Sequence, residues 1–282
     1  MPRFTEKEKA VRKTIMEPVL AGDPCPPVEE IAKENSLSVQ EFADVLKNLE
    51  ASVCIAVTDD SHAVMETFQD EELDRPTPTQ GEIFYARPFA TFKNHYPVTI
   101  AGKQKWYGEC AVESCAISNM FPGKEVVVNS ICRQTKEPVE LTLRDGEVLS
   151  YIPKTLRVHY GFPISHFFDD IIGWCSYNSF FSSEEAVEEW RKSHPEVKGI
   201  TRSPTETANW IHNVIGSRLP YDYQLTMPLL KAMLNIKPYG FTKPLQKLGG
   251  LPVPDMFLFN IPGLLIGMRR NGYKQYVRFS LM

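Results

Sequence analysis

The sequence predicts an α+β protein with a winged-helix-like three-helix domain, followed by a core of antiparallel β-sheets with flanking helices. Apolar residues recur at helical spacing over the first third of the chain. Short strand-like runs joined by Gly-containing turns then dominate the middle. An acidic stretch with prolines at 69–80 separates the two patterns and is expected to be a linker.

Three helices are predicted before this linker. Residues 5–20 carry apolar side chains at helical spacing, and prolines interrupt the chain before a second helix at 28–34. Ser38 and Glu41 have the spacing of a capping box, which predicts that a third helix begins there and runs over 39–49. The apolar residues of this third helix share one face, as expected for a helix that packs on a core.

A hairpin is predicted after the third helix and completes the winged-helix pattern. Residues 53–57 and 63–68 are strand-like and flank the turn Asp59-Asp60-Ser61. Many winged helices bind DNA, but residues 1–75 hold 8 Lys and Arg against 17 Asp and Glu. Because DNA affinity depends largely on attraction to phosphate, we expect no nucleic-acid partner.

The chain after the linker combines strands with helices. Strands are predicted at 92–95, 97–100, 104–107, 125–132 and 139–143, with Gly-containing turns at 101–103 and 144–146. Helices are predicted at 110–119, 182–193 and 203–215, and serines begin the last two.

The composition is that of an ordinary soluble protein, with 43% hydrophobic and 23% charged residues and a net charge of −4. No apolar run approaches the roughly 18 to 20 residues that a membrane span requires. The charged N-terminus lacks the apolar stretch of a secretory signal, so we expect a cytoplasmic protein. The six cysteines have neither disulfide-framework nor zinc-site spacing and are expected to be free in a reducing compartment.

Two thiols and one carboxylate form the strongest candidate site. The segment Glu109-Cys-Ala-Val-Glu113 places Cys110 three residues before Glu113, on the same face if the segment is helical. Cys175 lies farther along the chain in an aromatic-rich stretch. A thiol pair suits a soft metal, and a nearby carboxylic acid can protonate a group that leaves the metal. A helix start would also stabilise a Cys110 thiolate.

Each of these residues also has a purely structural interpretation. A cysteine is more often a small buried residue than a reactive one, and Cys175 alone would be expected in the core. Glu113 on an outer helix face would simply be solvated. His159 and His166 precede Cys175 and could add a ligand, although we expect them to be merely hydrogen-bonded.

The other cysteines are expected outside the site. Cys115 follows Cys110 by an offset of about 140° around a helix, so both cannot easily face one centre, and we expect Cys115 in the core. Cys132 ends a Val-rich strand and is expected to be structural, and neither Cys25 nor Cys54 suggests a site.

The chain resembles the organomercurial (alkylmercury) lyases from about Pro26 to Ile215. The resemblance includes the winged-helix-like start, Ala101-Gly-Lys103 before Trp106-Tyr107-Gly-Glu-Cys110, Met120-Phe-Pro122 and the segment 130–139. It ends with Cys175-Ser-Tyr-Asn-Ser-Phe-Phe-Ser-Ser183, Ala186, Trp190 and His194-Pro195. The order and the spacing of these segments both match.

The resemblance implies cleavage of carbon–mercury bonds by protonolysis to a hydrocarbon and Hg(II), in mercury resistance and detoxification. It implies that Cys110 and Cys175 bind mercury as thiolates, that Glu113 is the catalytic proton donor, and that Cys132 is structural. No organic cofactor is implied, and small external thiols or a mercuric reductase would remove Hg(II).

The resemblance also implies three regions. Residues 1–80 are the winged-helix-like domain with its linker, and residues 81–217 are an alkylmercury-lyase-like catalytic core. Residues 218–282 are a C-terminal extension of unknown role. We expect this extension to pack within the fold, with an oligomer contact or a membrane-surface contact as alternatives.

Glu113 departs from the family, which has aspartate at this position. The additional methylene displaces the carboxyl group at a site where small misplacements cost large rate factors. A second hypothesis is therefore a non-enzymatic or repurposed thiol-based protein of the same fold that binds a soft metal or metalloid. A third, a metal-responsive DNA-binding regulator, is disfavoured by the acidic N-terminal region.

Overall fold

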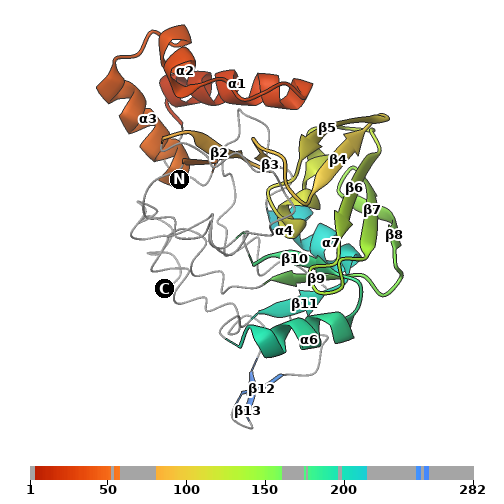
Figure 1. Ribbon diagram of the computed structural model, residues 1–282. Coiled ribbons are helices and arrows are strands. Elements are labelled where there is room, and N and C mark those ends of the chain that lie inside the picture. The colour runs from red at the N-terminus through yellow and green to blue at the C-terminus, as the bar shows by residue number, and fades with distance from the viewer. Residues whose placement is uncertain are drawn as a thin grey trace.

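Three N-terminal helices precede antiparallel sheets that alternate with further helices along the chain, which confirms the predicted α+β fold class (Figure 1). A computed structural model describes residues 4–51, 54–57, 81–160, 175, 177–195, 199–214, 246–248 and 251–253. Three N-terminal helices lie at one end of the molecule, and the β-sheets with their flanking helices form the remainder of the described structure.

The three predicted N-terminal helices are present as α1 (Glu6–Ala21), α2 (Val28–Glu34) and α3 (Val39–Ala51). The predicted capping box at α3 forms: the Ser38 backbone N–H donates to Glu41 Oε2 at 3.1 Å, and the Glu41 N–H donates to Ser38 Oγ at 3.4 Å. The apolar face of α3 is turned inward, so its packing rather than its propensity holds this helix in place.

A three-stranded sheet follows, with the order β1 (Ile55–Val57), β2 (Ile83–Ala86) and β3 (Phe89–Ala90). Strand β1 falls within the first arm of the predicted hairpin, whereas the second arm at 63–68 and the linker at 69–80 lie outside the described residues. The described partner of β1 is β2, and helices α1 and α3 pack against these two strands. This sheet therefore connects the helical part with the rest of the fold.

The largest sheet has five antiparallel strands in the order β5 (Lys103–Tyr107), β4 (Pro97–Ile100), β6 (Val126–Ile131), β7 (Pro138–Arg144) and β8 (Glu147–Ile152). Four of these strands were predicted. The strand predicted at 92–95 is wrong, because the Asn94 side chain folds this segment into a turn. It accepts a hydrogen bond from the Tyr96 N–H at 2.9 Å and donates one to the Gly108 carbonyl at 2.7 Å.

A second antiparallel sheet has the order β10 (Ser179–Phe181), β9 (Arg157–Tyr160) and β11 (Ile200–Arg202). The predicted helices at 182–193 and 203–215 are confirmed as α6 (Glu184–Ser193) and α7 (Pro204–Val214). Strands β12 (Gln246–Leu248) and β13 (Leu251–Val253) pair with each other. Among the helices that the structure describes, none combines the length and the apolar character that a bilayer span requires.

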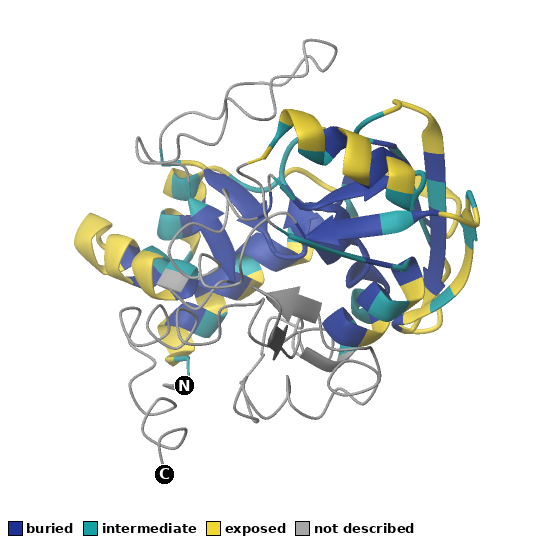
Figure 2. Cartoon of the chain, turned by 90° about the horizontal axis from the view of Figure 1, so that it is seen from below, coloured by how far each residue is buried: buried dark blue, intermediate teal, exposed yellow. Residues whose placement is uncertain are grey.

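The helix predicted at 110–119 is shorter than expected and lies in the interior. It is divided into α4 (Ala111–Ser114) and the 3-10 helix η2 (Ile117–Met120). Helix α4 contacts β9, β10 and α7, and all four of its residues are buried. Figure 2 shows the buried residues concentrated in the strands and the inner helix faces, with exposed residues on the outer faces.

Gly108 joins β5 to this buried helix and has no room for a side chain. A Cβ atom at this position would clash with the Ser114 side chain. We predict that Gly108→Ala lowers the free energy of unfolding by about 1–3 kcal/mol, which urea denaturation would measure. Adding Ser114→Ala should restore part of that loss, because it removes the clashing hydroxyl. Full stability of the Gly108→Ala protein would contradict this account of the packing.

Candidate active site

The segment 108–115 carries the predicted site residues into the interior at the end of β5. Gly108 forms an isolated antiparallel bridge with Phe89, and the Glu109 N–H donates to the Pro88 carbonyl at 3.0 Å. These contacts hold the segment against the turn between β2 and β3. Cys110 adopts an extended conformation and immediately precedes α4, whose single turn provides few aligned peptide dipoles.

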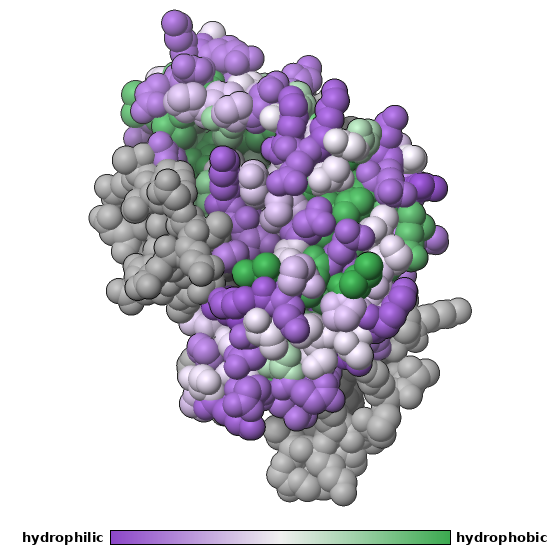
Figure 3. Space-filling view, turned by 45° about the vertical axis from the view of Figure 1, so that its right-hand side comes forward, coloured by the Kyte–Doolittle hydropathy of each residue, from purple (hydrophilic) through white to green (hydrophobic). Residues whose placement is uncertain are grey.

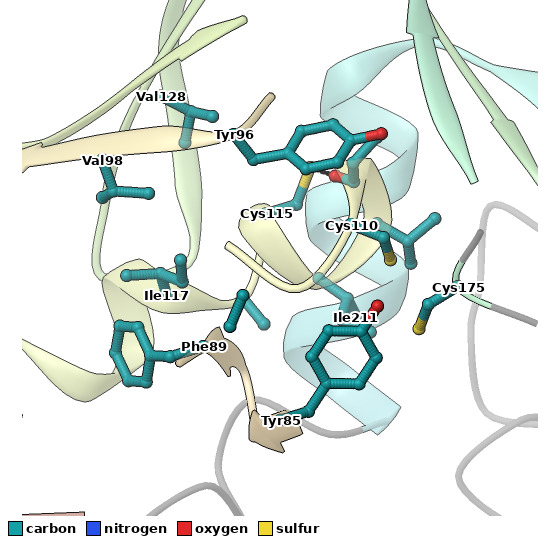
Figure 4. Close-up of a cluster of buried hydrophobic side chains, with 14 of the residues drawn as sticks. Tyr85, Phe89, Tyr96, Val98, Cys110, Cys115, Ile117, Val128, Cys175 and Ile211 are labelled. Atoms are coloured by element: carbon teal, nitrogen blue, oxygen red, sulfur yellow. Dashed lines mark hydrogen bonds between the residues drawn. The ribbon is translucent and has the colours of Figure 1, made fainter. Parts of the chain in front are cut away.

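Cys175 meets Cys110 although 64 residues separate them in the sequence. The Asn178 carbonyl accepts hydrogen bonds from the Ala111 N–H at 3.3 Å and from Tyr96 Oη at 3.0 Å. The Asn178 side-chain amide lies 3.8 Å from Cys110 Sγ, and the two thiols are hydrogen-bonded to each other. Figure 4 shows both sulfur atoms beside the Tyr85 hydroxyl. The structure therefore brings the two predicted thiols together.

Glu113 is fully buried on α4, which excludes the interpretation of a solvated helix residue. One carboxylate oxygen, Oε1, forms an ion pair with Arg87 Nη2. The other, Oε2, has no hydrogen-bond partner among the described residues. Burial raises the pKa of Glu113 although the Arg87 charge opposes the shift. A buried carboxyl group with a raised pKa holds its proton more tightly than an exposed one, which suits a proton donor.

Glu109 is a second buried carboxyl group that sequence reasoning missed. Its Oε1 accepts a hydrogen bond from Cys175 Sγ at 2.9 Å, and its Oε2 lies 3.0 Å from Arg87 Nε. Burial raises the pKa of Glu109 to about 8; Arg87 opposes the shift and Glu113 adds to it. Its position directly before Cys110 was the available signal, but a strand end does not reveal which way a side chain points.

Arg87 is the other residue that the sequence did not reveal. It lies in the two-residue connection between β2 and β3 and is 3% exposed, so its charge is removed from water. Burial alone would lower the pKa of Arg87, but Glu109 and Glu113 raise it above its ordinary value. One guanidinium therefore faces two carboxyl groups, and we expect the carboxyl pair to retain a proton.

The thiols lie in the same low-dielectric environment. Burial raises the pKa of Cys175 well above its ordinary value, and the hydrogen bond with Cys110 adds to the shift. A buried thiol with a raised pKa resists ionisation, so it requires a nearby base before it can bind a metal as thiolate. The arrangement places two sulfur atoms, the donor type that soft metals prefer, beside a carboxyl pair able to carry a proton.

The remaining cysteines make other contacts. Cys115 is buried, as predicted, and its thiol donates to the Ala111 carbonyl at 3.3 Å. Cys132 accepts hydrogen bonds from Ser182 Oγ and the Thr135 N–H, both at 3.4 Å, so it connects β6 with the chain after β10.

The histidines add no ligand within the described part of the chain. His159 is hydrogen-bonded to Thr201 Oγ1 at 3.2 Å, as expected for a structural residue. Burial, assisted by the charge of Arg191, lowers the pKa of His159 to about 3 and keeps the ring neutral. His166 lies outside the described residues.

Few large apolar side chains are exposed in the described part of the chain. The face in Figure 3 is mostly hydrophilic, with scattered apolar side chains. The large apolar residues exposed in the described structure are Val39, Leu149 and Ile152. Scattered apolar residues of this kind are normal on soluble proteins, so the buried cluster remains the best candidate site.

Comparisons with known proteins agree on one family. Residues 89–216 match a family model described as alkylmercury lyase. An alkylmercury lyase of Staphylococcus epidermidis is 28% identical over 227 residues, which cover 76% of this chain and 87% of that protein. An alkylmercury lyase of Bacillus cereus is 30% identical over 124 residues, which cover 43% of this chain and 52% of that protein. The solved mercury-bound form of MerB2 is 17% identical, with a TM-score of 0.54, and the match covers 73% of this chain and 88% of that chain. This last likeness shows a shared fold.

The raised pKa of Glu109 predicts a pH dependence of stability. Because the folded protein binds this proton more tightly than the unfolded chain, the contribution is full below a pH of about 4.5 and is lost as the pH rises through about 8. We predict that the free energy of unfolding falls less steeply from pH 5 to pH 9 in Glu109→Gln than in wild type.

Urea denaturation at several pH values would measure this slope. Exposed Glu147 offers a matched control, and Glu147→Gln should retain the wild-type slope. An equally steep fall in the Glu109→Gln protein would show that Glu109 has an ordinary pKa in the folded state.

Proposed function

Because the chain belongs to the alkylmercury lyase family, we propose that it is an organomercurial lyase that cleaves carbon–mercury bonds by protonolysis. The observation that carries this proposal is the contact of two buried thiols, Cys110 and Cys175, beside two buried carboxyl groups. The products would be a hydrocarbon and Hg(II).

The two thiols would bind the mercury atom of the substrate. Cys110 is the first ligand and Cys175 the second, because thiolate sulfur is the soft ligand that mercury prefers. Two thiolates increase the electron density on mercury and weaken its bond to carbon. The burial of both sulfurs supports this role, since exclusion of water protects the metal–thiolate bonds and strengthens local electrostatics.

Glu113 would supply the proton that the leaving carbon takes. The carbon–mercury bond breaks heterolytically, the electron pair stays on carbon, and the proton of the Glu113 carboxylic acid completes the hydrocarbon. The raised pKa of Glu113 supports this role, because burial makes the carboxyl group hold its proton more tightly than an exposed glutamate would. The unpartnered Oε2 is the oxygen available to carry that proton.

Small external thiols or a mercuric reductase would then remove Hg(II) from the two sulfurs. We propose no organic cofactor for this reaction and place the protein in the cytoplasm as part of mercury detoxification. All six cysteines are free thiols, which fits a reducing compartment.

Turnover of an organomercurial tests the proposal. Purified protein incubated with methylmercury and excess small thiol should release methane and Hg(II) in equal amounts, measured by gas chromatography and mercury analysis. Stoichiometric retention of methylmercury without methane would instead indicate a thiol-based binding protein.

Substitution of single cysteines should distinguish the thiols that bind mercury from a thiol that only packs in the core. We predict that Cys110→Ser and Cys175→Ser each lower turnover by at least about 100-fold, since a hydroxyl is a poor ligand for mercury. Cys115→Ser is the matched control and should retain most activity, because its thiol contacts only the α4 backbone among the described hydrogen bonds. Equal losses in all three proteins would mean that the effect is structural.

A further inference from the structure

We infer that Glu109 is a second catalytic residue of the proposed lyase, namely the base that takes the thiol proton of Cys175 when its sulfur binds mercury. This inference rests on the proposed function and adds a residue outside the Cys110-to-Glu113 spacing. It assigns the two proton transfers to different carboxyl groups. Glu109 accepts the proton of the Cys175 thiol, and Glu113 donates a proton to the leaving carbon.

The contacts distinguish the two carboxyl groups. Cys175 Sγ donates its hydrogen directly to Glu109 Oε1 at 2.9 Å, so the proton already lies on the path that it would travel. Glu113 makes its ion pair with Arg87, and no hydrogen bond joins it to either thiol among the described residues. The carboxyl group that touches the second mercury ligand is therefore Glu109.

The environment favours this transfer. The charged and titratable groups that influence Glu109 are Arg87, Glu113 and Cys175, and Glu109 in turn acts on the Tyr85 hydroxyl. Arg87 Nε lies 3.0 Å from Glu109 Oε2, while Glu109 Oε1 faces the Cys175 thiol, so one oxygen meets a positive charge and the other meets the proton to be transferred.

The protons and electrons balance without an oxidant or reductant. Methylmercury arrives as a complex with a small thiol and is exchanged onto Cys110, whose proton leaves on the displaced small thiol. The bound methylmercury then meets the Cys175 thiol, whose proton moves to Glu109 as its sulfur forms the second bond to mercury. The carbon–mercury bond then breaks, its electron pair stays on carbon, and the Glu113 proton forms methane. Glu109 now holds one proton and Glu113 holds none, so the carboxyl pair carries a single proton before and after.

Arg87 is a positioning residue in this scheme. Its Nε lies 3.0 Å from Glu109 Oε2, and its Nη2 contacts Glu113 Oε1, so one rigid guanidinium fixes both carboxyl groups. Its single charge stabilises one carboxylate at a time, which allows the ionised position to alternate between Glu109 and Glu113.

Two reactions of the same protein test this division. Binding of inorganic Hg(II) requires both thiols to ionise but breaks no carbon–mercury bond, and ultraviolet mercury–thiolate absorption follows it by stopped flow. Single-turnover release of methane from methylmercury reports both steps. Glu109→Gln keeps the length and an acceptor oxygen of the side chain but cannot take the proton.

We predict that Glu109→Gln slows the second Hg(II)–thiolate bond and methane release, each by about 100-fold or more. Glu113→Gln should slow methane release to a similar extent, while its rate of Hg(II) binding stays within about twofold of wild type. Glu147→Gln should behave as wild type in both reactions. A purely structural role for Glu109 does not produce this split between the two variants.

The inference is overturned if Glu109→Gln binds Hg(II) at the wild-type rate, or if both glutamine variants lose the two reactions equally. Failure of the proposed function is a separate result, because wild-type protein would then bind Hg(II) and release no methane. In that case, slow Hg(II) binding by Glu109→Gln would still support Glu109 as the base for Cys175.

Discussion

The ion pairs of Arg87 with Glu109 and Glu113 are the interaction on which the site depends. All three groups are nearly inaccessible to water, and an isolated buried charge costs several kcal/mol. The charges of the three groups balance only if one carboxyl group is neutral, because the single positive charge of Arg87 faces two acids. The same balance that makes this buried cluster tolerable therefore favours one protonated carboxyl group in contact with Cys175.

The fold assembles this cluster from three separate places. The connection between β2 and β3 supplies Arg87, the end of β5 supplies Glu109 and Cys110, and the segment before β10 supplies Cys175. Backbone hydrogen bonds hold these three segments together: the Glu109 N–H donates to the Pro88 carbonyl, and the Ala111 N–H donates to the Asn178 carbonyl. Backbone contacts of this kind position side chains more rigidly than side-chain contacts alone, which suits chemistry that is sensitive to small displacements.

The sequence predicted the local features well and the long-range ones poorly. The capping box of Ser38 and Glu41 has a fixed spacing, so the start of α3 could be predicted. The long-range pairing of Cys110 with Cys175 is an exception, because the resemblance to the alkylmercury lyases predicted it and local spacing did not. Arg87 left no signal, because its pairing with Glu109 depends on how a two-residue connection meets a distant strand end. Asn94 replaced the strand predicted at 92–95 with a turn, since side-chain hydrogen bonds to the backbone compete with strand pairing.

The length of the Glu113 side chain matters for its contact with Arg87. A glutamate extends its carboxyl group one methylene farther from α4 than an aspartate would, and here that group contacts Nη2 of the guanidinium. Nε of the same guanidinium lies beside Glu109, so both acids are anchored to one planar group and titrate as a pair. Glutamate at 113 therefore shares its guanidinium partner with a second acid at 109. The two residues are better understood as one unit than as a displaced proton donor with an unrelated neighbour.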